Sequence, residues 1–171
     1  DNDLRIIPEI ANSWTISPDG LTYSFNLRED VYFHSSPLFG SKKTRKVVAA
    51  DFVYSFDRLR NKKIASPGGW VMQQVNYYEA KEKHVLTIRL KNPFPAFLGL
   101  LTMRYCAVVP MEITSHYGED FRSNPIGTGP FYFKQWDENV KLVLRKNPKY
   151  FEIDEQGHRL PYLDAVAIEF I

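Results

Sequence analysis

Four histidines and one cysteine are the side chains of this sequence that most often serve catalysis or metal binding. The histidines, His34, His84, His116 and His158, are far apart, and none forms a recognisable ligand spacing with another histidine, a cysteine or an acidic residue. Cys106 lies in the apolar run "YCAVVP", a setting typical of a small buried thiol. We therefore predict hydrogen-bonded or surface histidines, no metal site, no cofactor and no enzyme. A cysteine hydrolase stays open only if the fold brings a histidine to Cys106.

The stretch "NPIGTGPFYF", residues 124–133, has the glycine content of a phosphate-binding loop. Such a loop needs converging backbone N–H groups and usually a helix behind it. Here Gly127 and Gly129 precede Pro130, which has no N–H, and a strand pattern follows without a lysine at the required spacing. The pattern predicts a structural turn, with at least one of the two glycines at positive φ.

Charge and hydropathy exclude two further classes of function. Lys and Arg number 22 against 20 Asp and Glu, a net charge of +2, which is too small to indicate a nucleic-acid surface. The basic run "KKTRK", residues 42–46, lacks interleaved aromatics, so it predicts a solvated loop. Apolar runs such as "FLGLL" are far shorter than the roughly 20 residues of a membrane helix.

The opening "DNDLRIIPEI" is not a signal sequence, and we expect a segment of a longer chain.

Alternating apolar and polar residues are the main periodic signal, and they predict β-hairpins joined in an α+β fold with a mostly antiparallel sheet. The expected hairpins cover residues 14–28, 75–91 and 129–146, with a last strand at 163–171. Helical spacing predicts a helix over 48–60, packed on one common sheet through Phe52 and Phe56, and short helices within 95–103 and 111–121. No repeat or linker interrupts the chain, so residues 1–171 are expected to form a single domain.

Several segments in this order resemble the extracytoplasmic solute-binding proteins of peptide and nickel ABC transporters, of the family 5 type. They are "PEIANSWTISPDGLTYSFNLREDVYFH", "VVAADFVYSFDRL", "NPIGTGPFYF", "LVLRKNPKYF" and "LPYLDAVAIEFI". The resemblance implies a two-lobed periplasmic-binding-protein type II fold, of which this chain would be the accessory subdomain of the first lobe, without the second lobe.

The same resemblance implies a function. The full-length protein would be a monomer in the periplasm or another extracytoplasmic space, with a lipid anchor at its N-terminus. It would capture a solute, expected to be an oligopeptide, and pass it to an ABC permease. A sensory or chaperone-like binding module of the same fold is the alternative, and the segments do not distinguish peptide from nickel chelate, oligosaccharide or heme.

For the site, the resemblance suggests Trp70, Arg104 and Tyr105 as ligand-binding residues, and Gly127 to Pro130 as a structural turn beside the interlobe region. Relatives often offer an aromatic directly after "ASP", where this chain has Gly68 and Gly69, so Trp70 would substitute from a shifted position. A surface ion pair for Arg104 and core packing for Tyr105 are equally compatible with the sequence. The loop at residues 35–46 is longer and more basic than in relatives, which leaves its role open.

Overall fold

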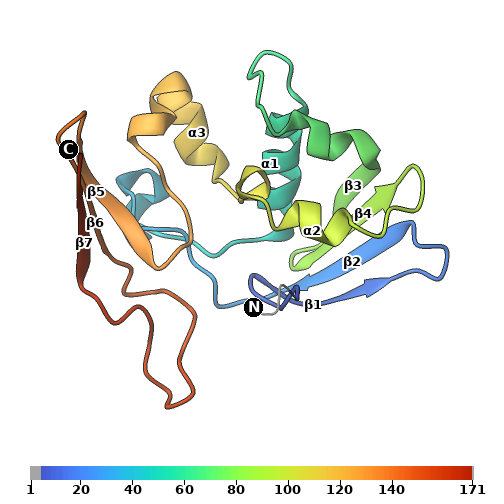
Figure 1. The fold of residues 1–171 in the computed structure, drawn as a ribbon, viewed down its shortest axis with the longest axis horizontal. Coiled ribbons are helices and arrows are strands. Elements are labelled where there is room, and N and C mark those ends of the chain that lie inside the picture. Colours follow the sequence, from blue (N-terminus) through green and yellow to red (C-terminus); the bar gives the residue numbers. More distant parts are fainter. Residues whose placement is uncertain (1–4, 171) are drawn as a thin grey trace. The chain divides into compact units, whose positions relative to one another are not determined.

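The computed structural model describes residues 5–170, and these residues divide into two compact units, each with its own antiparallel sheet (Figure 1). Within the described residues, the first unit comprises residues 5–29 and 48–108, and the second comprises residues 30–47 and 109–170. The chain therefore passes from the first unit to the second and back before it ends in the second.

The first unit has a four-stranded sheet with the strand order β1-β2-β4-β3. Its strands are β1 (Ala11–Ile16), β2 (Thr22–Leu27), β3 (Val75–Glu82) and β4 (Val85–Leu90). The turn between β1 and β2 contains Gly20 at φ 69°, a conformation that glycine adopts without steric cost. Strand β4 bonds to β2 on one side and to β3 on the other, so it joins the two hairpins into one sheet.

Alternation places the apolar side chains of β2 and β4 on one face of this sheet. Tyr23 lies opposite Ile88 and Phe25 lies opposite Leu86, and all four side chains are buried. Directly opposed apolar pairs stabilise a sheet and fix its register, because a shift by one residue would expose them. This face is the floor of the first unit's core.

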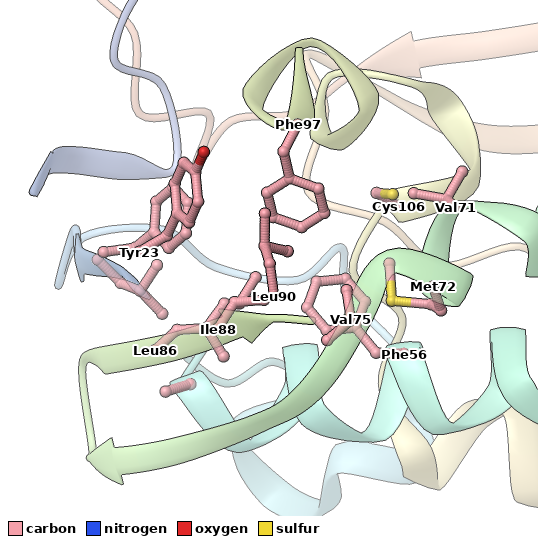
Figure 2. Close-up of a cluster of buried hydrophobic side chains, with 13 residues drawn as sticks. Tyr23, Phe56, Val71, Met72, Val75, Leu86, Ile88, Leu90, Phe97 and Cys106 are labelled. Carbon is pink, nitrogen blue, oxygen red and sulfur yellow. The ribbon is translucent and has the colours of Figure 1, made fainter. Parts of the chain in front are cut away.

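Helix α1 (Ala49–Arg60) covers the core face. It begins where the Val48 N–H donates to the Asp51 carboxylate at 2.9 Å, which satisfies one of the free N–H groups at the helix start. Phe56 is 2% exposed, and its ring meets the ring of Tyr78 on β3 edge to face at 5.3 Å. Figure 2 shows Phe56 directed into the cluster that also contains Leu90. The expected packing of this helix is confirmed.

Three short helices complete the first unit: η2 (Gly69–Gln74), α2 (Phe97–Leu101) and η3 (Arg104–Cys106). Phe97 is fully buried, and its ring contacts that of Tyr23 at 5.2 Å (Figure 2). Helix η2 contributes Val71 and Met72, which are both buried in the same cluster. These helices are therefore anchored to the core by a few side chains each, which fixes the loops on either side of them.

The second unit has a three-stranded sheet with the order β5-β6-β7. Its elements are η1 (Pro37–Lys42), α3 (Met111–Tyr117), η4 (Gly118–Ser123), β5 (Phe131–Asp137), β6 (Lys141–Lys146) and β7 (Ala165–Glu169). Asn139 in the β5–β6 turn has φ 59°, which asparagine tolerates better than most residues. No helix within residues 5–170 has the length and apolar content needed to cross a bilayer.

The basic run 42–46 is only partly solvated. Lys42, Lys43 and Lys46 are exposed as expected, but Arg45 is half-buried. Its Nε and Nη2 atoms donate to the two carboxylate oxygens of Glu112 on α3 at 2.6 and 2.7 Å, and its guanidinium lies over the ring of Phe33. The expectation of a solvated loop is wrong for Arg45, because a two-pronged ion pair and an aromatic face bind its guanidinium group. It is also wrong for Thr44, which is 7% exposed and donates its hydroxyl to the Phe33 carbonyl.

The predicted hairpins and helices are confirmed, and the expected single common sheet is wrong. Strand β7 pairs with β6 in a separate three-stranded sheet. Strand β4 hydrogen-bonds to β2 on one edge and to β3 on the other, so neither edge is free to pair with the second sheet. The α+β, mostly antiparallel fold class holds for both units, and a single domain stays a prediction. The expected last strand, 163–171, is observed as β7, and residue 171 lies outside the described residues, as do residues 1–4 of the opening stretch.

Truncating Phe56 tests the packing of α1. We expect Phe56→Ala to lower the free energy of unfolding by about 3–5 kcal/mol, since a buried ring is replaced by a cavity. Urea unfolding followed by circular dichroism measures the change. The matched control is Ile64→Ala, because Ile64 is 41% exposed just beyond the same helix and should cost less than about 1 kcal/mol. Equal losses in the two variants would show that α1 is not docked through Phe56.

Candidate functional site

All three side chains suggested for ligand binding lie in the first unit, on two short helices. Trp70 is on η2 and remains 45% exposed, although it is a large apolar side chain. Arg104 and Tyr105 are on η3, where Arg104 is exposed and Tyr105 is half-buried. The Arg104 guanidinium carbon lies 5.6 Å from the centroid of the Tyr105 ring. Aromatic faces and a cation are therefore available at the surface of these helices.

Two glycines bring the start of η2 close to Tyr105 and to the end of α1. A Cβ atom at Gly68 would lie 2.5 Å from Tyr105 Cγ and still closer to Tyr105 Cβ. A Cβ atom at Gly69 would lie 2.8 Å from the Leu59 carbonyl oxygen. Both distances are shorter than carbon atoms tolerate, so only glycine fits at these positions. The segment that carries Trp70 thus lies directly against Tyr105.

This close approach bears on the roles of Tyr105 and Arg104, which the sequence left open. Tyr105 packs against the backbone of Gly68 without belonging to the buried core cluster, and part of its side chain stays accessible. Arg104 lies over an aromatic ring, an arrangement that leaves its donors available for a carboxylate. Their roles in ligand binding stay predictions, but the structure does bring the segment of Trp70 and Tyr105 together.

Cys106, the neighbour of Tyr105, has the properties of a structural thiol. It is 6% exposed, its Sγ donates to the Leu100 carbonyl at 3.6 Å, and burial raises its pKa to about 11. A cysteine nucleophile reacts as the thiolate, which a pKa this high disfavours near neutral pH. Burial and the raised pKa therefore do not favour Cys106 as a nucleophile.

The loop from Gly127 to Pro130 is held by side chains of the second unit. The Gly127 N–H donates to His34 Nδ1 at 3.3 Å, and His34 Nε2 lies 2.9 Å from the Gly129 carbonyl oxygen. Asn147 Nδ2 donates to the same Gly129 oxygen at 3.0 Å. The Gly127 N–H and the Gly129 carbonyl thus bond within the protein, which supports the interpretation of this stretch as a structural turn.

The expected positive φ at one of these two glycines is wrong. The glycines of the structure with φ in the left-handed region are Gly20, Gly40, Gly118 and Gly157. A Cβ atom at Gly129 would meet nothing within 4 Å, and one at Gly127 would be 3.9 Å from His34 Cε1. Hydrogen bonds to His34 and Asn147 hold the loop in a backbone conformation that other residues can also adopt.

An open cavity of about 570 Å³ lies beside this loop in the second unit. Strands β5 and β6 line it with alternate apolar side chains, namely Phe131, Phe133, Trp136, Leu142 and Leu144. Arg122 and His34 are its polar lining, and the Arg122 guanidinium lies 5.0 Å from the Trp136 ring. Sequence reasoning missed this cavity, although the alternation in "FYF" and "LVL" already indicated one apolar strand face.

Among the other histidines, His158 makes a contact that its spacing alone did not single out. Its Nδ1 lies 3.1 Å from Asp154 Oδ2, and the same carboxylate accepts the Tyr162 hydroxyl. These hydrogen bonds lower the pKa of Asp154, with the bond from Tyr162 as the largest cause. Residues 5–170 contain no group of three or more His, Cys, Asp or Glu side chains placed to hold a metal ion.

Comparison with known proteins gives this fold a class. The solved structure of the ABC transporter-associated periplasmic binding protein DppA from Helicobacter pylori, in complex with the peptide STSA, matches 96% of this chain with a TM-score of 0.79 and 30% sequence identity. The match covers 34% of that protein. The expected fold class is confirmed, because the structural neighbours are two-lobed periplasmic binding proteins of the type II fold.

Sequence comparison identifies the family. The profile described as "Bacterial extracellular solute-binding proteins, family 5 Middle" matches residues 5–171, and the chain belongs to this family. Di/tripeptide-binding protein 2 of Pseudomonas aeruginosa is 34% identical over 86% of this chain and 30% of its own length. The glutathione-binding protein GsiB of Salmonella typhi is 28% identical over 98% of this chain and 30% of its own length. The chain thus spans about a third of the length of these relatives.

Adding a methyl group at Gly68 tests the close approach to Tyr105. We expect Gly68→Ala to reduce the free energy of unfolding by about 1–3 kcal/mol, because the new Cβ overlaps Tyr105 Cβ, which its own backbone fixes in place. Gly99→Ala is the matched control: a Cβ atom there meets nothing within 4 Å inside α2, so the change should be neutral or stabilising by up to about 1 kcal/mol. Denaturant unfolding of both variants gives the comparison. A neutral Gly68→Ala would refute the contact.

Proposed function

We propose that this chain is part of the solute-binding component of an ABC importer, which captures an oligopeptide outside the cytoplasmic membrane. The observation that carries this proposal is the family match over residues 5–171 together with relatives that are named as di/tripeptide-binding and glutathione-binding proteins. The structural match to a protein solved with a bound peptide supports the same solute class. Within the whole protein, we propose that the chain supplies the accessory part of the first lobe.

The proposed contribution of this chain to binding is an aromatic wall with a cation beside it. Trp70 is 45% exposed, and burying such a ring against a ligand removes a large apolar area from water. Tyr105, fixed against Gly68, presents its accessible part next to the segment of Trp70. Arg104 would pair with a ligand carboxylate. A peptide, with apolar side chains and a terminal carboxylate, fits this combination.

Binding without chemistry is part of the proposal. The family consists of solute-binding proteins, and the one cysteine of the chain is buried with a raised pKa, so we propose that the protein is not an enzyme. Its place would be the periplasm or another extracytoplasmic space, with an ABC permease as its partner. A monomeric state and a lipid anchor stay predictions.

Peptide titration of the full-length protein tests this function. We expect isothermal titration calorimetry with a mixed library of di- and tripeptides to show saturable binding. Trp70→Ala should weaken it about 10- to 100-fold, which corresponds to the loss of about 1.4–2.8 kcal/mol from one buried aromatic contact. Residues 1–171 alone should bind the same peptides only weakly, because one wall cannot exclude water from the ligand.

The control variant is Tyr162→Ala, which removes an aromatic ring of 67% exposure in the second unit. It should leave peptide affinity unchanged. Absence of peptide binding by the full-length protein, with another solute found by native mass spectrometry after purification, would contradict the oligopeptide class. Unchanged affinity in Trp70→Ala would instead retain the class and remove Trp70 from the site.

A further inference from the structure

His34 links two segments of the second unit that are far apart in sequence. Its backbone N–H donates to the Gly127 carbonyl at 2.8 Å, and its ring accepts from the Gly127 N–H and reaches the Gly129 carbonyl oxygen. Three hydrogen bonds from a single residue thus hold the loop of residues 124–130. The residue is only 7% exposed, so water does not readily replace these bonds.

The partners of the ring define its protonation state. Nδ1 receives the Gly127 N–H at 3.3 Å and must therefore carry a lone pair. Nε2 lies 2.9 Å from the Gly129 carbonyl oxygen, which can only accept, so Nε2 must carry the proton. The neutral ring with its proton on Nε2 satisfies both contacts. The imidazolium ion would set an Nδ1–H donor against the Gly127 N–H donor.

The surroundings of the ring also oppose a positive charge. From η4, Arg122 lines the same cavity and is itself a cation, and from β5 the Tyr132 ring lies 6.3 Å from the imidazole centroid. Strand β6 and the residue directly after β7 contribute only the apolar Leu142, Leu144 and Phe170 to this lining. Among the described residues that line the cavity, none is a carboxylate that could stabilise an imidazolium ion.

We propose that His34 is an acid-sensitive latch, which holds the Gly127–Gly129 loop while the ring is neutral and releases it when the ring is protonated. The ring would change from an acceptor to a donor at the Gly127 N–H, and a charge would appear beside Arg122 in an apolar cavity. Opening the loop removes the contact between the two N–H donors and also the buried charge, since the ring then reaches water. This latch does not depend on the proposed transport function.

The direction of the pH effect follows from the two states of the latch. Burial lowers the pKa of His34 in the closed loop, and the bond to Gly129 only partly offsets this effect. A free imidazole has a pKa of about 6.5, so below this pH the open form binds more protons than the closed form. The closed loop is thus fully stable above about pH 6.5. Below it, opening becomes favoured by up to about tenfold per pH unit until the closed-state pKa is reached.

NMR and hydrogen exchange on the full-length protein test the latch. Nitrogen shifts of the His34 ring should show the Nε2–H tautomer at pH 7.5. Protection factors, which correct for the intrinsic pH dependence of exchange, should fall at Gly127 between pH 6.5 and pH 5, by at most about tenfold per pH unit. Unchanged protection at Gly127 over this range would overturn the proposal.

Two variants separate the latch from general acid sensitivity. His34→Asn keeps a donor and an acceptor but does not titrate, so it should abolish the pH dependence at Gly127. His116→Gln removes an exposed imidazole of the same unit and should leave that dependence intact. Persistence of the full pH effect in His34→Asn would refute the proposal. If that variant does not fold, the wild-type titration decides: the Gly127 amide must follow the His34 ring with the same midpoint, and different midpoints refute the latch.

Discussion

The first unit depends on the position of β4 between β2 and β3. Its residues Leu86, Ile88 and Leu90 all point to one face and are at most 3% exposed, so the strand is both the hydrogen-bonded centre of the sheet and the floor of the core. Because α1 packs on this floor through Phe56, its last turn is also fixed. The Leu59 carbonyl at that turn then limits residue 69 to glycine, which sets where Trp70 emerges at the surface. The candidate ligand wall is thus a consequence of strand order.

Local patterns were sufficient to predict the elements but not their assembly. Each hairpin carries its own alternation and turn residues, such as Gly20 at φ 69°, so its strands could be located within a few residues. The division into two sheets could not be foreseen, because the pairing of β2 with β4 joins segments separated by α1 and by β3. No periodicity encodes which hairpin a distant strand will join. Apolar alternation indicated two-faced strands and left the partner undetermined.

In the candidate site, too, contacts between residues that are distant in sequence could not be predicted. Resemblance suggests Trp70 and Tyr105, but the close approach of Gly68, in the segment before Trp70, to Tyr105 depends on the packing of two helices that the sequence does not reveal. His34 and Gly127 are 93 positions apart, so their contact has no sequence signal. The expected positive φ near Gly127 is wrong because glycine content alone does not require a left-handed backbone. Side-chain hydrogen bonds from His34 and Asn147 fix the loop instead.

The burial of Cys106 makes this protein well suited to site-specific labelling. It is the only cysteine among the 171 residues, and it is 6% exposed with a pKa of about 11. Maleimides and related reagents consume thiolates that they can reach, and Cys106 offers neither accessibility nor charge. Cysteines introduced on the surface would therefore react without removal of the native one. Two such cysteines in one unit could then carry a pair of fluorophores or spin labels that report a distance while the core stays intact.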